Sequence, residues 1–157
     1  MKFIFPASQS RTNLFTDAYD TLSNLIGVSM AYSTGGGGTQ ARSLTYSSLS
    51  RLLSAANPES GTISYQYDAN GNLTHKADAR SITTDYSYDQ LNRPTFRGYS
   101  GSTPDVTYTY DGSGVPYGKG RVASVSSSVS TTSYLKYDAT GMVLENTQTT
   151  NGPKPNG

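Results

Sequence analysis

The sequence contains no cysteine and no tryptophan, and it has one histidine among 157 residues. Without cysteine the chain has no disulfide, no thiol nucleophile and no zinc–thiolate site. No apolar run approaches the roughly 18 residues that a membrane-spanning helix needs. The first residues also lack the apolar stretch of a signal peptide. These absences exclude several classes of enzyme and membrane protein before any motif is considered.

An excess of charge of one sign is missing too. Lys and Arg together number 12 and Asp and Glu 11, which gives a formal net charge of +1. A nucleic-acid groove or an electrostatic membrane binder needs clustered Lys and Arg. The sequence therefore predicts no nucleic-acid partner. Tyrosine, by contrast, is abundant at 13 copies, and a chain built on tyrosine and β-branched residues favours strands over helices.

A short element that ends in Tyr-Asp recurs along the chain. Three copies read Tyr-x-Tyr-Asp, a fourth reads Leu-Lys-Tyr-Asp, and two weaker copies precede them, one with Ser in the Asp place. Their last residues fall at positions 20, 47, 68, 89, 111 and 138, at intervals of 27, 21, 21, 22 and 27. Such a period indicates a repeat architecture. The repeat-defining residues are Tyr19, Asp20, Tyr46, Tyr65, Tyr67, Asp68, Gly71, Leu73, Tyr86, Tyr88, Asp89, Asn92, Tyr108, Tyr110, Asp111, Tyr137, Asp138 and Gly141.

Each copy has the pattern of a strand, a tight turn and a returning strand. The consensus is Tyr-x-Tyr-Asp-x-x-(Gly/Asn/Ser)-(Asn/Arg)-Leu. Two tyrosines spaced by two leave the same face of a strand, and an Asp at the start of a turn accepts backbone N–H bonds. The third residue after Asp is expected at positive φ, which Gly takes freely and Asn tolerates. These positions are Gly71, Asn92 and Gly141.

The fold class that follows is all-β. We expect consecutive antiparallel β-hairpin repeats of about 21 residues in a twisted, curved sheet. Residues 1–15 are expected to form a weakly ordered N-terminal segment, and residues 151–157 a disordered tail. The repeat region, residues 16–150, has about six repeats and a loop insertion near residues 33–40. Pro94 replaces the expected Leu, which predicts a bulge or an edge strand there.

At this spacing the Tyr-x-Tyr-Asp element resembles the RHS, or YD, repeat. The resemblance covers roughly residues 19–150, and residues 65–111 fit it best. It implies large bacterial surface or secreted proteins and the animal teneurins, in which strands spiral into a hollow β-shell. In polymorphic-toxin and insecticidal-toxin relatives the shell encloses a variable C-terminal toxin. YD repeats are also linked with carbohydrate binding.

The chain departs from the complete pattern of that family. It has no Asp-Pro-x-Gly-Leu segment, which marks the boundary of the toxic domain in toxin members. Six units are also too few to close a shell. We therefore expect a fragment of a longer array or a short member.

The sequence predicts no enzyme, and no catalytic, cofactor-binding or metal-binding residue. His75 is the only imidazole and is expected at the surface. There is no Gly-x-Ser-x-Gly elbow and no phosphate-binding loop. The aspartates recur in phase with the repeat, as structural residues do. The turn at Asp68 offers several oxygens, but its glycine stands fourth instead of sixth as in an EF-hand, so Asx-turn capping is favoured over calcium.

The tyrosine pairs leave two interpretations open. Their rings could stack as a structural ladder, since cross-strand aromatic pairs stabilise sheets. Alternatively, the same rings could offer flat faces and hydroxyls to a sugar. The residues of a possible glycan contact are Tyr65, Tyr67, Tyr86, Tyr88, Tyr108 and Tyr110.

The predicted function is that of a non-enzymatic structural segment in an exported RHS-type protein. It would contribute to a β-shell that encloses or displays a C-terminal toxin or effector. The alternative is a cell-surface carbohydrate- or receptor-binding module. The expected partners are neighbouring repeats of a longer chain, or a second copy of this chain bound through open strand edges; the alternative function adds carbohydrate. The localisation implied by the resemblance is extracellular or at the bacterial cell surface.

Overall fold

Side chains along several strands alternate between half-buried and exposed positions, as expected where successive residues leave opposite faces. In β5 (Gly61–Tyr67), for example, Ile63, Tyr65 and Tyr67 are half-buried while Ser64 and Gln66 are exposed. The structure is a computed structural model that describes residues 13–32 and 38–150. These residues form twelve strands and no helix. The predicted all-β hairpin fold is confirmed.

The chain divides into two compact units, residues 1–65 and 66–157, and the boundary falls near the end of β5. The earlier strands of the first unit are β1 (Asn13–Tyr19), β2 (Leu25–Tyr32), β3 (Gly38–Tyr46) and β4 (Leu52–Asn57). Those of the second are β6 (Leu73–Ala77), β7 (Thr83–Tyr88), β8 (Pro94–Tyr99), β9 (Val106–Tyr110), β10 (Val122–Ser126), β11 (Ser130–Tyr137) and β12 (Val143–Thr150).

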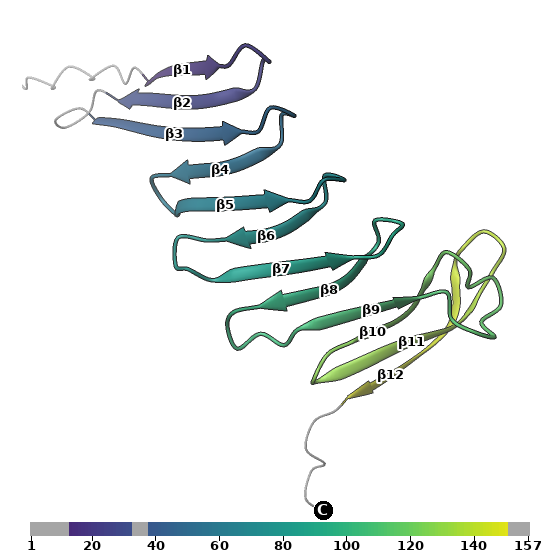
Figure 1. The fold of residues 1–157 in the computed structure, drawn as a ribbon. Helices are drawn as coiled ribbons and strands as arrows, with labels where there is room; N and C mark the ends of the chain where they lie inside the picture. The colour runs from purple at the N-terminus through teal and green to yellow at the C-terminus, as the bar shows by residue number, and fades with distance from the viewer. Residues whose placement is uncertain (1–12, 33–37, 151–157) are drawn as a thin grey trace, which may run out of the picture. The chain divides into compact units, whose positions relative to one another are not determined.

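Within each unit the strands are hydrogen-bonded in chain order, and each pair is antiparallel. Figure 1 shows the connections alternating between the two edges of the sheet in each unit. The odd-numbered strands run toward the edge that carries the Tyr-Asp turns. The even-numbered strands return from it. We call the row of Tyr-Asp turns at this end of the strands the turn edge, and we call the even-numbered strands the return strands.

The return strands carry a bulge close to the turn edge. In the β7–β8 pair, Ser87 faces Phe96 but Tyr88 faces Pro94, so Thr95 is left out of register. The bulge predicted from Pro94 is therefore confirmed. Comparable register shifts occur beside the Tyr-Asp turn in the β1–β2, β3–β4, β9–β10 and β11–β12 pairs. A bulge bends the strand and increases its twist.

A long connection after β9 covers the most buried side chain of the described residues. Residues 111–121 join β9 to β10 through successive tight turns at Gly112, Val115 and Gly118. The carbonyl of Pro116 accepts a hydrogen bond from the Tyr137 backbone amide, with N···O 3.2 Å. Tyr137 is only 5% exposed. The repeat resumes at Arg121, whose carbonyl pairs with the amide of Asp111.

The segments expected at residues 1–15, 33–40 and 151–157 are described by the structure only in part. β1 begins at Asn13, inside the segment 1–15 that was expected to be weakly ordered. In the loop insertion expected near residues 33–40, residues 38–40 belong to β3, while 33–37 lie outside the described residues. The tail 151–157 also lies outside them. No helix in the described part is long and apolar enough to span a membrane.

Candidate functional site

The Tyr-Asp turns at Asp20, Asp68, Asp89 and Asp138 use one local hydrogen-bond pattern, whereas Asp111 opens the longer connection to β10. At Asp68, the backbone amide donates to the carbonyl of Asn72 (3.0 Å), and the amide of Gly71 donates to the Asp68 carbonyl (3.1 Å). The Asp68 carboxylate accepts the backbone amide of Asn72 at 2.8 Å and its side-chain amide at 2.9 Å. The Asn72 side-chain hydrogen bond is the main cause that lowers the pKa of Asp68. The carboxylate thus acts as a turn cap.

The same pattern recurs at the other turns. Asp20, Asp89 and Asp138 each accept the backbone amide four residues ahead. Hydrogen bonding lowers the pKa of each of these carboxyls. Ser47, which stands in the Asp place of the second copy, accepts the Arg51 amide through its hydroxyl at 3.2 Å. A hydroxyl therefore substitutes for a carboxylate at this turn.

Positive φ occurs three residues after the capping residue. Gly71, Asn92 and Gly141 have φ of 89°, 59° and 102°, as predicted. The equivalent Ser23 and Ser50 adopt 64° and 56°. A left-handed residue at this place closes a short hairpin loop with a bulge.

One turn of this kind was missed by the sequence reasoning. Asp78 caps a turn on the opposite edge, between β6 and β7, and accepts the amides of Arg80 and Ile82 through the same carboxylate oxygen. Ser81 has φ of 62° there. Hydrogen bonding to Arg80 lowers the pKa of Asp78. The Asp-x-x-Ser spacing of residues 78–81 is the sequence signal for this turn. It lacks the preceding Tyr-x-Tyr element that marks the other turns.

Successive turns of the second unit are linked to one another. The side-chain carbonyl of Asn92 accepts the side-chain amides of Asn70 (3.1 Å) and Asn72 (2.8 Å) from the preceding turn. Arg93 pairs with Asp89 of its own turn at 2.7 Å and with Asp111 of the following turn at 2.9 Å. The chain of contacts therefore runs from the turn at 68–72 through the turn at 89–93 to Asp111.

Arg93 also lies over the ring of Tyr110, with 4.2 Å from its guanidinium carbon to the ring centroid. Its hydrogen bonds to Asp111 and Asp89 raise its pKa. In turn, the backbone amide of Gly120 and the Arg93 side chain lower the pKa of Asp111. The sequence signal for Arg93 was the Asn/Arg place in the consensus, for which sequence reasoning assigned no role.

The last tyrosine of an outgoing strand is bonded to the first residue of the preceding return strand. The hydroxyl of Tyr88 donates to the carbonyl of Leu73 at 2.9 Å, and that of Tyr110 to Pro94 at 2.8 Å. Tyr137 donates in the same way to Val122 at 2.7 Å. Burial raises the pKa of all three phenols. We call this contact the tyrosine lock.

The backbone register is the same at four of the five hairpin-to-hairpin junctions of the described residues. At four junctions the third residue of the return strand faces the residue three places before the final tyrosine of the next strand. These pairs are Gly27–Ser43, Ser54–Ser64, His75–Asp85 and Phe96–Thr107. At the β10–β11 junction the pairing moves by one residue, where β11 carries an additional bulge. Register is specified by turns and side-chain pattern together.

The tyrosines considered for glycan contact lie on the half-buried face of their strands. Tyr65 and Tyr67 share one face of β5, and Tyr86 shares one with Tyr88 on β7. Tyr108 and Tyr110 do the same on β9. The return strand β8 lies between β7 and β9 and places Arg97, not a tyrosine, opposite Tyr86.

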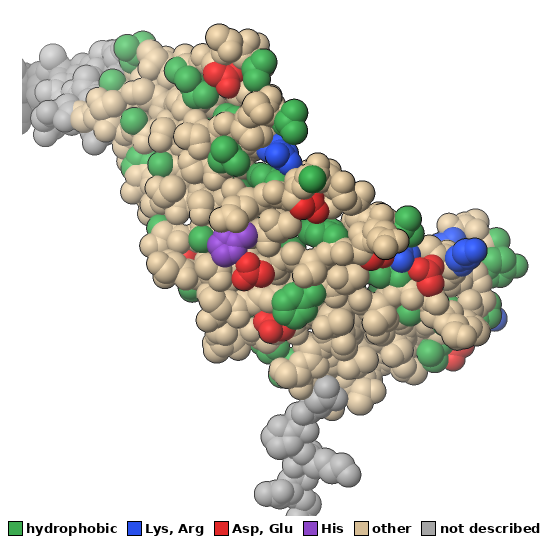
Figure 2. Space-filling view, viewed as in Figure 1, with side chains coloured by type: hydrophobic (Ala, Val, Ile, Leu, Met, Phe, Trp, Pro, Cys, Tyr) green, Lys and Arg blue, Asp and Glu red, His purple; other side chains and the backbone are tan. Residues whose placement is uncertain are grey.

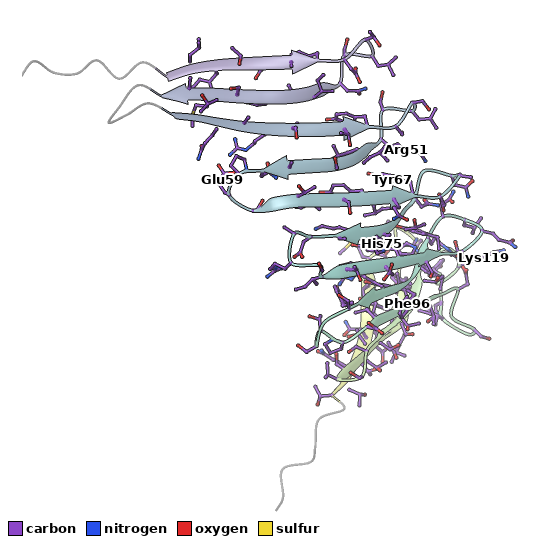
Figure 3. All side chains as sticks on the ribbon, turned by 60° about the vertical axis from the view of Figure 1, so that its left-hand side comes forward. Arg51, Glu59, Tyr67, His75, Phe96 and Lys119 are labelled. Atoms are coloured by element: carbon purple, nitrogen blue, oxygen red, sulfur yellow. The ribbon has the colours of Figure 1, made fainter. Side chains whose placement is uncertain are left out.

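The remaining predicted repeat residues occupy corresponding places. Tyr19 and Tyr46 end β1 and β3, and Leu73 begins β6. Figure 3 shows Arg51 at the turn edge of the first unit and Glu59 at the opposite edge. Glu59 pairs with Arg42 across 2.7 Å.

The opposite face of the sheet carries small polar residues. Thr45 bonds Ser54 and Thr109 bonds Ser124 across strands, each at 2.7 Å. His75 lies on this face, and its Nδ1 is 2.6 Å from a carboxylate oxygen of Asp85. Figure 2 shows the imidazole, in purple, at the molecular surface. The described residues hold no group of three or more His, Asp or Glu side chains that could hold a metal ion.

Part of the amino-acid sequence matches a known repeat family. The family described as RHS Repeat matches residues 46–80 and 67–95. These matches cover the turns at Ser47, Asp68 and Asp89. Residues 46–95 carry RHS repeats. No curated protein sequence matches it.

Solved structures of toxin-complex proteins resemble the fold over most of this chain. The Photorhabdus luminescens Tc holotoxin pore with a TccC3 mutation gives a TM-score of 0.51 at 11% identity, covering 85% of this chain and 8% of that one. The crystal structure of TcdB2-TccC3 gives a TM-score of 0.52 at 12% sequence identity, and the match covers 84% of this chain and 9% of that one. The chain thus spans less than a tenth of the length of these structures. At such identity the likeness shows the fold.

The RHS repeats of this chain form a structural segment. Each hairpin is joined to the next by backbone pairing, and in the second unit also by tyrosine locks and turn-to-turn bonds. The polar groups that recur with the repeat are engaged in these contacts.

Proposed function

We propose that this chain is part of an exported, extracellular or cell-surface protein whose RHS repeats form a β-shell around a C-terminal toxin or effector. The observation that carries the proposal is the register shared by four of the five junctions of the described residues, because a repeated register allows hairpins to be added with the same geometry. The likeness to toxin-complex structures supports it. The chain's own role in that protein is containment or display, with no chemical step of its own.

The alternative of carbohydrate or receptor binding has less support. Tyr88 and Tyr110 direct their hydroxyls to carbonyls of the sheet itself, so these hydroxyls already have a partner in the fold. Their rings lie on the half-buried face. Nothing in this geometry favours a sugar over simple packing.

Protease protection of the complete native protein tests the proposal. The native reading frame on both sides of these residues is sequenced first, and we expect further Tyr-Asp units and a C-terminal domain of unrelated sequence. In the intact protein that domain should resist protease until the shell is opened by denaturant. The same domain expressed alone is the control and should be digested. Equal digestion in both settings, or a frame without further repeats, would contradict containment.

A further inference from the structure

The two outermost strands of the described residues have complementary ends. β1 is paired only with β2, and β12 only with β11. β1 runs toward the turn edge of its unit, and β12 runs away from the turn edge of its own. A β12 from one molecule and a β1 from another would therefore lie antiparallel with their turn edges on the same side.

Both strands expose apolar side chains of a size that sheets normally cover. Leu14 and Phe15 of β1 are each 61% exposed, and Leu144 of β12 is 56% exposed. Every residue of β12 is exposed. An exposed apolar edge strand is a template for pairing with another chain.

The internal junctions provide the geometry of that pairing. Tyr19 is the last residue of β1 and Val143 the first residue of β12. They occupy the positions of Tyr88 and Leu73, or of Tyr110 and Pro94, in the tyrosine lock. Tyr19 is 59% exposed, unlike the half-buried Tyr88 and Tyr110.

We propose that the outer edge of β12 receives β1 of a second copy of this chain, with the Tyr19 hydroxyl donating to the Val143 carbonyl. The register follows from the four internal junctions: Glu145, third in β12, faces Thr16, three places before Tyr19. The association is head-to-tail, because the two edges that meet are different. The surface is continuous with the junctions already described.

Disulfide trapping tests the register directly, since the chain has no cysteine. Chains with Thr16→Cys and chains with Glu145→Cys are mixed and oxidised mildly. We expect a cross-linked dimer from the mixture. The control pair, Thr16→Cys with Thr149→Cys, lies four residues out of register, roughly 13 Å along the strand, and should give little product. Equal cross-linking in the control, or cross-linking of Glu145→Cys with itself alone, would overturn the proposal.

Sedimentation over a range of concentrations tests the lock. The wild-type chain should associate, and Tyr19→Phe should weaken the association about fivefold, the effect of one net hydrogen bond. Tyr117→Phe is the matched control, since Tyr117 is 63% exposed in the long connection, and it should leave the association unchanged. A wild-type chain that stays monomeric, or equal effects of the two variants, would refute the head-to-tail contact.

This inference can fail while the proposed function stands. A monomeric chain would exclude pairing between copies but leave the shell segment intact within a longer protein. A protein without further repeats or a protected domain would remove the shell proposal, and pairing between copies would remain measurable.

Discussion

At the scale of single residues, the repeat depends on one backbone requirement and one cap. Ser, Gly and Asn all occupy the third place after the cap, and all adopt positive φ there. Gly takes that conformation without steric cost, and Asn tolerates it. The sequence predicted these positions at Gly71, Asn92 and Gly141. It did not predict serine in the same role, because serine has no strong left-handed preference.

Gly71→Val should destabilise the chain by about 1 kcal/mol or more, because a β-branched residue resists positive φ. A Cβ atom at Gly71 would have no neighbour within 4 Å, so the expected cost comes from the backbone conformation. Gly101→Val is the control, since Gly101 has equally open surroundings and φ outside the left-handed region. Urea unfolding measures both variants. An equal decrease in the free energy of unfolding of both variants would show that the left-handed conformation at Gly71 does not cause the loss of stability.

At the scale of elements, the hairpin junction is the unit of construction. Alternation and turn residues predicted the hairpins, and Pro94 predicted a bulge. The contacts between hairpins could not be predicted, because they join residues 15 or 16 apart whose pairing depends on which strands are neighbours. For the same reason the sequence could not show that a return strand separates the tyrosine-bearing strands.

Tyr110→Phe should lower the free energy of unfolding by about 1 kcal/mol, because it removes the hydroxyl that bonds the Pro94 carbonyl and keeps the ring. Tyr108→Phe, on the same strand and face, is the matched control. Its hydroxyl makes no hydrogen bond seen within the described residues, so a much smaller change is expected. Chemical denaturation of both variants decides between them, and equal losses would argue against the lock.

At the scale of the whole chain, the same ionisable groups recur from end to end. Hydrogen bonding lowers the pKa of the six capping carboxyls below their ordinary value. Their contribution to stability is therefore present above that value and is lost as pH falls through the folded-state pKa. Burial raises the pKa of the lock tyrosines, so their contribution is lost as pH rises above about 10.

The urea midpoint should therefore stay level near neutral pH and fall below about pH 4. A variant with Asp68→Asn, Asp89→Asn and Asp138→Asn should show a flatter acid limb, because an amide oxygen still accepts the turn amides but does not titrate. Glu145→Gln, an exposed carboxyl outside the turns, serves as the control. An unchanged acid limb in the triple variant would show that other groups govern acid unfolding.

The fold class and the resemblance to RHS repeats could be predicted from the sequence because the same local pattern recurs several times. Tyr-x-Tyr-Asp followed by Gly or Asn specifies the strand, the cap and the left-handed residue without long-range information. The paired Arg93, the Asp78 turn and the junction register required the strand order. The contacts of these residues establish a structural segment, and the containment proposed for it is what the protease experiment tests.

The strict chain-order pairing has a mechanical consequence. Among the described residues, a strand within each unit is paired only with its sequence neighbours, so tension applied across a unit loads the outermost pair of that unit first. Hydrogen bonds of a hairpin pulled at its open end break one after another and do not share the load. A unit of this kind yields in steps of one or two strands at low force, and the interior strands keep their register while the edge is peeled away.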